Sequence, residues 1–210
     1  AVWMPRFGSV VFVLGAGLSL CACLPFVGDL DRISLARAFS MLDGAGRFLG
    51  CRDSKYGRIC LSKRDDQYQF YRDGRFEYAY PDPYSREAPV HIALSSHPSP
   101  SRMLVLGGGL PDRVAAARVH GIREITYLYL DEAEHRMVGP TLGGDNFGID
   151  VNVRFKDARV FVSEAKSKFD VVILFASHPK SAAQNRFYTK EFYSSVEKLL
   201  ADGGVFFLQT

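Results

Sequence analysis

The second half of the chain alternates between short apolar runs and segments with helical spacing. From residue 102 on, the apolar runs include MLVLGG, EITYLYLD, FDVVILFA and GGVFFLQ, and the segments between them include DRVAAARVHG and RFYTKEFYSSVEKLL. Strands that alternate with helices form a parallel sheet with right-handed crossovers and helices on both faces. VVILF and VFFL are typical of strands buried on two sides. The alternation therefore predicts a Rossmann-like α/β domain over residues 99–210.

The loops that follow the strands form the candidate site of this domain. Ligands of such sheets bind at the carboxyl ends of the strands, where the strand order reverses. In this chain these are the loops after Leu106, Leu130 and Phe175. The first of them contains Gly107, Gly108 and Gly109, which allow close approach of the backbone to a ligand or, equally, close packing of strand against helix.

Short β-type runs precede the α/β domain. GRICLSK, YQFYR and RFEYAY are separated by Arg64-Asp65-Asp66 and by Asp73-Gly74, which are good turn sequences. They predict a meander of about three strands. A short helix follows over Glu87–His97 and ends at two prolines. The small β region and this helix together span residues 51–98.

The first part of the chain contains an uncharged stretch, residues 7–28. As a helix it would be ~33 Å long, which matches the ~30 Å hydrocarbon core of a bilayer. We therefore predict a transmembrane helix over residues 1–28, then an amphipathic helix and a glycine-rich linker over residues 29–50. A secretory signal, a buried core helix and a strand entering a GxGxxG turn are the alternatives. The last of these lacks its third glycine, where Leu20 stands.

Composition excludes several classes of function. The 210 residues carry 26 Lys and Arg against 23 Asp and Glu, and the basic residues are scattered, so no nucleic-acid partner is expected. The four cysteines form no CxxC pair and no spacing that fills a zinc site, so no metal is expected. Cys51 and Cys60 could meet across a hairpin. Reduced, partly buried thiols are the interpretation we favour for a cytosol-facing domain.

Several segments taken together resemble the spermidine synthase (polyamine aminopropyltransferase) family, from about residue 53 to residue 210. They are DSKYGRI at 53–59, RDGRFE at 72–77, EAPVHIAL at 87–94, MLVLGGG, FDVVIL and FYTKEFYSSVEKLLADGGVFFLQ. The apolar N-terminal stretch makes the chain similar to membrane-anchored members. The resemblance implies a β-hairpin region joined to a methyltransferase-type Rossmann domain. It also implies transfer of an aminopropyl group from decarboxylated S-adenosylmethionine to a diamine.

The resemblance also identifies positions where this sequence departs from the family's catalytic motif. The family's D-x-x-D-P pattern supplies the acids that handle the amine, and here Phe175 and His178 stand at its two Asp positions. A phenylalanine has no proton acceptor. His178 has a suitable intrinsic pKa of ~6.5 but the wrong place for the same task. No catalytic residue is therefore assigned.

The motifs that bind the cofactor in the family have also lost polar residues in this sequence. The GGGDGG loop of the family reads GGGLPD here, and the E-x-D acids that grip the ribose read Tyr129-Leu130-Asp131. The adenine-side D-G reads Asp157-Ala158. The remaining candidate cofactor-binding residues are Gly107, Gly108, Gly109, Asp131 and Asp157.

These losses at several polar positions, with the packing positions kept, favour a catalytically degenerate protein without a cofactor. We expect a membrane-anchored accessory or scaffold subunit whose partners are other membrane protein subunits and the lipid bilayer. The expected location is a bacterial inner membrane, with the α/β domain on the cytoplasmic side. Family domains continue beyond the FLQ strand, so truncation would leave residues 205–208 at an apolar sheet edge. The alternative is an active aminopropyl- or methyl-transferase that uses decarboxylated S-adenosylmethionine or S-adenosylmethionine with a reassigned base.

Overall fold

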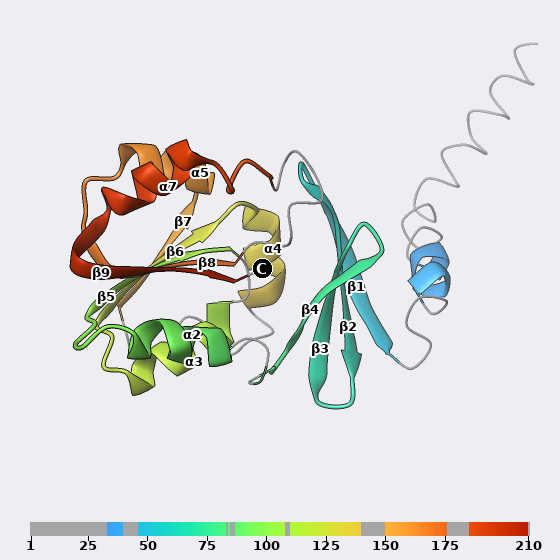
Figure 1. The fold of residues 1–210 in the computed structure, drawn as a ribbon. Coiled ribbons are helices and arrows are strands. Elements are labelled where there is room, and N and C mark those ends of the chain that lie inside the picture. The colour runs from blue at the N-terminus through green and yellow to red at the C-terminus, as the bar shows by residue number, and fades with distance from the viewer. Residues whose placement is uncertain are drawn as a thin grey trace, which may run out of the picture.

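The computed structural model describes residues 33–39, 46–82, 84, 87–107, 110–139, 150–175 and 185–209. A four-stranded antiparallel sheet lies beside a five-stranded parallel sheet, as Figure 1 shows. The transmembrane helix expected over residues 1–28 lies outside the described residues. Within the described ranges, no helix combines the length and the hydropathy needed to cross a bilayer.

The antiparallel sheet has one strand more than the sequence indicated. Its strands follow sequence order: β1 (Arg47–Ser54), β2 (Gly57–Arg64), β3 (Gln67–Arg72) and β4 (Arg75–Tyr80). The first half of β1 was expected to be linker, because Gly44, Gly46 and Gly50 were interpreted as loop residues. Gly50 instead pairs with Leu61 of β2, next to a register shift that follows Phe48. The Asp73-Gly74 turn between β3 and β4 has positive φ at both residues, as an Asp-Gly hairpin turn requires.

Cys51 and Cys60 form a disulfide across β1 and β2, so the expectation of reduced thiols is wrong. The two residues are directly opposite in the antiparallel register, with Cα atoms 4.1 Å apart, and this pairing brings their side chains together. They lie on the face of the sheet turned away from the α/β domain. There Phe39, from the helical segment 33–39, packs its ring edge-on against Tyr71 and contacts Cys60 (Figure 1).

The parallel sheet confirms the predicted α/β class. Its strand order is β7-β6-β5-β8-β9, and every pair is parallel. The strands are β5 (Arg102–Leu106), β6 (Glu124–Tyr129), β7 (Asp150–Phe155), β8 (Phe169–Phe175) and β9 (Leu200–Gln209). After β7 the chain crosses back over the sheet and enters β8 on the other side of β5, so the strand order reverses between β5 and β8. Among the described residues β9 pairs only with β8 and forms one edge.

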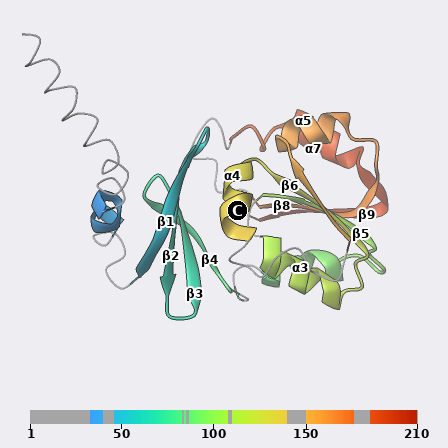
Figure 2. The ribbon, with the colours of Figure 1, turned by 180° about the vertical axis from the view of Figure 1, so that it is seen from behind.

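Helices cover both faces of the parallel sheet (Figures 1 and 2). α2 (Ala88–Ser95) and α3 (Leu110–Val119) lie on one face, and α5 (Ala158–Glu164) and α7 (Lys190–Glu197) lie on the other. Successive side chains of a strand point to opposite faces. Met103 therefore joins the core under α2 and α3, whereas Leu104 joins the core under α5 and α7. α4 (Glu132–Val138) follows β6 and lies between the two sheets.

Candidate functional site

A pocket of about 230 Å³ opens at the carboxyl ends of the parallel strands. The strand order reverses at β5 and β8, and both of these strands contribute to the pocket, as the rule for open α/β sheets predicts. Most of its wall is apolar. The lining residues are Leu106, Gly107, Leu128, Leu130, Lys156, Ala158, Leu174, Phe175, Arg186 and Phe187.

Gly107 is required by the close approach of the ends of β5 and β8. Its φ of +119° lies in a region that side chains disfavour, and an added Cβ would lie 2.8 Å from the carbonyl oxygen of Phe175. Its own carbonyl accepts hydrogen bonds from Arg113 Nη1, at 2.9 Å, and from the Tyr127 hydroxyl. Gly107 is therefore needed for packing at the rim of the pocket. Gly108 and Gly109 lie outside the described residues.

Phe175 stands at the end of β8 and lines the pocket. Behind its ring lies the guanidinium of Arg113, with Cζ 3.2 Å from the ring centroid and only 5% of the residue exposed. The position where the resemblance implies an acid thus holds a phenyl ring stacked on a buried cation. Arg113 was missed from the sequence, although an arginine directly before the apolar run VAAA and four residues after Gly109 was a usable signal. His178 lies outside the described residues.

Tyr129 replaces the first acid of the ribose motif with an aromatic ring. The residue is 2% exposed, and its ring packs against Tyr127 and His135. A second position where a carboxylate was implied is therefore used for packing.

Asp131 does not face the pocket, because its side chain joins the two sheets. Its Oδ1 accepts a hydrogen bond from the Ala133 amide at 3.0 Å and caps α4. Its Oδ2 accepts from Ser54 Oγ at 2.6 Å and from Arg72 Nη1 at 3.0 Å, so β1 and β3 both contact it. Burial acts to raise the pKa of Asp131, but these hydrogen bonds outweigh it and hold the pKa below its ordinary value.

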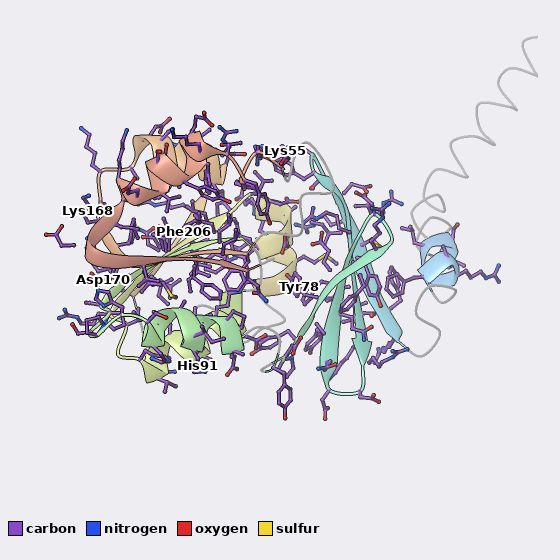
Figure 3. The ribbon with its side chains drawn as sticks, viewed as in Figure 1. Lys55, Tyr78, His91, Lys168, Asp170 and Phe206 are labelled. Atoms are coloured by element: carbon purple, nitrogen blue, oxygen red, sulfur yellow. A yellow bond between two sulfur atoms is a disulfide. The ribbon has the colours of Figure 1, made fainter. Side chains whose placement is uncertain are left out.

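Glu134 completes this connection from the next turn of α4. Arg72 Nη2 donates to its Oε2 at 2.8 Å, and the Tyr78 hydroxyl donates to its Oε1 at 2.9 Å. Figure 3 shows Tyr78 between the antiparallel sheet and α4. Burial raises the pKa of Glu134 above its ordinary value, although Arg72 and Tyr78 act against it. We call the following five residues the interdomain cluster: Ser54, Arg72, Tyr78, Asp131 and Glu134.

Asp157 lies beside the pocket, between the lining residues Lys156 and Ala158. Its Oδ1 caps α5 by accepting from the Arg159 amide at 2.9 Å. Its Oδ2 lies 2.6 Å from Arg186 Nη2. Both oxygens therefore have partners within the chain. In the part of the chain that the structure describes, no group of three or more His, Cys, Asp or Glu side chains could hold a metal ion.

Comparison with known proteins finds a matching domain family and several relatives of this chain. Residues 83–210 match the Spermine/spermidine synthase domain. The polyamine aminopropyltransferase of Oceanobacillus iheyensis is 29% identical over 167 residues, 75% of this chain and 32% of that protein. That of Korarchaeum cryptofilum is 34% identical over 133 residues, 61% of this chain and 40% of that protein. The chain therefore spans less than half the length of these curated relatives.

Solved structures agree with this match at the level of the fold. A spermidine synthase in complex with the transition state analogue AdoDATO has a TM-score of 0.66 and 23% identity, covering 76% of this chain and 57% of that one. The spermidine synthase from Thermotoga maritima has a TM-score of 0.61 and 22% identity, covering 76% of this chain and 55% of that one. The family match over residues 83–210 includes every strand of the parallel sheet and all the lining residues of the pocket. The chain belongs to the Spermine/spermidine synthase domain family.

Proposed function

We propose that the chain is the nucleoside-binding part of an aminopropyl- or methyl-transferase whose donor is decarboxylated S-adenosylmethionine or S-adenosylmethionine. The pocket at the strand-order reversal carries this proposal. Leu106, Leu128 and Leu130 give it the apolar walls that suit a purine ring. Its volume of about 230 Å³ is below the ~300–1,000 Å³ of sites for drug-sized ligands, so it suits a nucleoside better than a donor together with its acceptor.

The names of the curated relatives support the same class of activity, since both relatives named above are polyamine aminopropyltransferases. A sulfonium donor supplies the electrophilic carbon for such a transfer. The pocket residues bind the nucleoside and exclude water, but Phe175 offers no acceptor for the proton of an attacking amine. The proposal therefore needs a base in another place, and His178 is the candidate because its intrinsic pKa of ~6.5 suits proton transfer, although it stands at the second and not the first Asp position of the motif.

Binding of 5′-methylthioadenosine, measured by titration calorimetry, tests the nucleoside pocket. Leu130 is 41% exposed and lines the pocket, so Leu130→Trp should fill the pocket without disturbing the core. We expect it to weaken binding by about tenfold or more. Val119→Trp is the matched control, because Val119 is 78% exposed at the end of α3 and should leave affinity unchanged. If methylthioadenosine and both donors fail to bind at millimolar concentration, the proposal is wrong.

A second candidate function is a catalytically degenerate accessory subunit of a membrane assembly. The observation in its favour is that Tyr129 and Phe175 occupy two positions where the resemblance implies carboxylates. This candidate expects donor binding to be absent, or present without transfer, and the chain to co-purify with membrane proteins in mild detergent. Transfer of a labelled aminopropyl or methyl group by the purified chain would exclude it.

A further inference from the structure

The charge around the pocket is unlike that expected for a cationic donor. Among the described residues that line it, the ionisable side chains are Lys156 and Arg186, and none is a carboxylate. Arg113 adds a third cation behind Phe175. Decarboxylated S-adenosylmethionine carries a positive sulfonium and a positive amine, and like charges repel strongly at a partly buried site. The lining therefore favours a ligand that brings a negative charge.

Arg186 presents a donor that a ligand can satisfy. Its Nη2 is bound to Asp157, and its Cζ lies 4.7 Å from the ring centroid of Phe187, which fixes the guanidinium at the pocket wall. Its Nε is buried and has no hydrogen-bond partner in the described part of the chain. A buried donor without an acceptor costs stability, because it has lost its hydrogen bonds to water. A ligand oxygen at this wall would remove that cost.

Lys156 can exchange its partner at little cost. It forms an ion pair with Glu164, but the two side chains are 40% and 60% exposed. Ion pairs this exposed contribute little to stability, so the ammonium is available to a ligand anion.

Arg113 affects a ligand through the electric field of its positive charge and not through direct contact, because Phe175 lies between its guanidinium and the pocket. Hydrogen bonds to the Gly107 carbonyl and the Tyr127 hydroxyl hold the guanidinium in place under the end of the sheet. An aspartate at position 175, which the resemblance implies, would lie next to this cation and neutralise it. Phenylalanine does not neutralise Arg113. The positive field of the guanidinium therefore extends to the ends of β5 and β8, where the tail of the ligand would lie.

We propose that the pocket selects adenosyl ligands whose tail carries a carboxylate, such as S-adenosylmethionine and S-adenosylhomocysteine, over the same ligands without it. This selectivity rests on the proposed function, because it requires the adenosyl group to occupy this pocket. It assigns the donor class of the site, and it makes Arg113 and Phe175 specificity residues.

The test compares three ligands by calorimetry on the full chain: S-adenosylhomocysteine, its decarboxylated counterpart and 5′-methylthioadenosine. The wild-type chain should bind S-adenosylhomocysteine about tenfold more tightly than the decarboxylated ligand, as expected for one charge-assisted interaction. The preference should shrink as the salt concentration rises. Equal affinities, or a preference for the decarboxylated ligand, overturn the selectivity.

Substitutions at position 175 assign the preference to the charge of the site. Phe175→Asp should abolish or reverse it, whereas Phe175→Leu, which removes the ring without adding charge, should keep it. If Phe175→Asp fails to fold, Arg186→Gln tests the same point, because it removes a positive charge from the pocket wall and should reduce the preference. The salt series on the wild-type chain needs no variant. If methylthioadenosine binds but the carboxylate gives no advantage, only this inference fails. If none of the three ligands binds, the proposed function fails with it.

Discussion

The pocket and the interdomain cluster use charge in opposite ways, although they meet at neighbouring residues. Leu130 lines the pocket, and the next residue, Asp131, turns its carboxylate toward Ser54 and Arg72. In the cluster a single guanidinium is held by two buried carboxylates, and Glu77 of β4 also pairs with it. In the pocket two cations line an apolar wall. The acids that follow β6 thus attach the antiparallel sheet to the α/β domain and leave the ligand side without carboxylates among its described lining residues.

Removing the cation of the cluster should have the largest effect on stability. Arg72→Met leaves Asp131 and Glu134 buried without their shared partner, and breaking a buried ion pair in this way costs about 3–5 kcal/mol. Urea unfolding of the variant and the wild type measures this loss in the free energy of unfolding. The same substitution at Arg186 is the control. Its pair with Asp157 is partly exposed, so about 1 kcal/mol or less is expected. Similar losses at the two sites would remove the distinction between cluster and pocket.

Breaking the disulfide on the other face of the same sheet should have a smaller effect. Cys51 and Cys60 close a short loop, with a sequence separation of 9, and constraining such a loop contributes about 2–3 kcal/mol. The double variant Cys51→Ser, Cys60→Ser should lose this amount in urea unfolding and should not respond to added reductant. Since the disulfide and Arg72 have no partner in common, the two losses should add. A wild-type chain whose unfolding is unchanged by reductant contradicts the prediction.

The pH dependence of stability should show a modest contribution from Glu134. Its pKa in the folded chain is raised above its ordinary value of 4.5, so the folded state holds the proton more tightly than the unfolded state does. The resulting stabilisation is complete below pH 4.5 and is lost as the pH rises through the folded pKa. Its slope cannot exceed about 1.4 kcal/mol per pH unit. Asp131 titrates below this window, because its pKa is lowered from 3.8.

Glu134→Gln removes that titrating group while keeping a polar side chain next to Tyr78. Unfolding free energies measured from pH 4.5 upward should therefore fall less steeply in the variant than in the wild type. Parallel pH profiles for the two proteins would show that Glu134 does not contribute to the dependence.

Much of the fold was accessible from the sequence because it depends on local pattern. The order of strands and helices after residue 102 follows from apolar runs and helical spacing, and the structure places β5, β6, β8 and β9 where those runs lie. β1 was missed because Gly44, Gly46 and Gly50 resemble a linker and because its partner strand, not its own composition, makes it a strand. The disulfide was open for the same reason, since it depends on the register of β1 against β2.

The candidate site likewise has features that follow from local sequence and features that depend on residues distant in the sequence. Residue types and their spacing were enough to predict the parallel sheet, the loops at its carboxyl ends and the lack of acids at positions 129 and 175. The folded chain was needed to show that Asp131 binds Arg72, which lies 59 residues away, and that Arg113 stacks behind Phe175. The physical reason is that a charged side chain takes its role from the groups that replace water around it. Those groups come from segments that folding brings together.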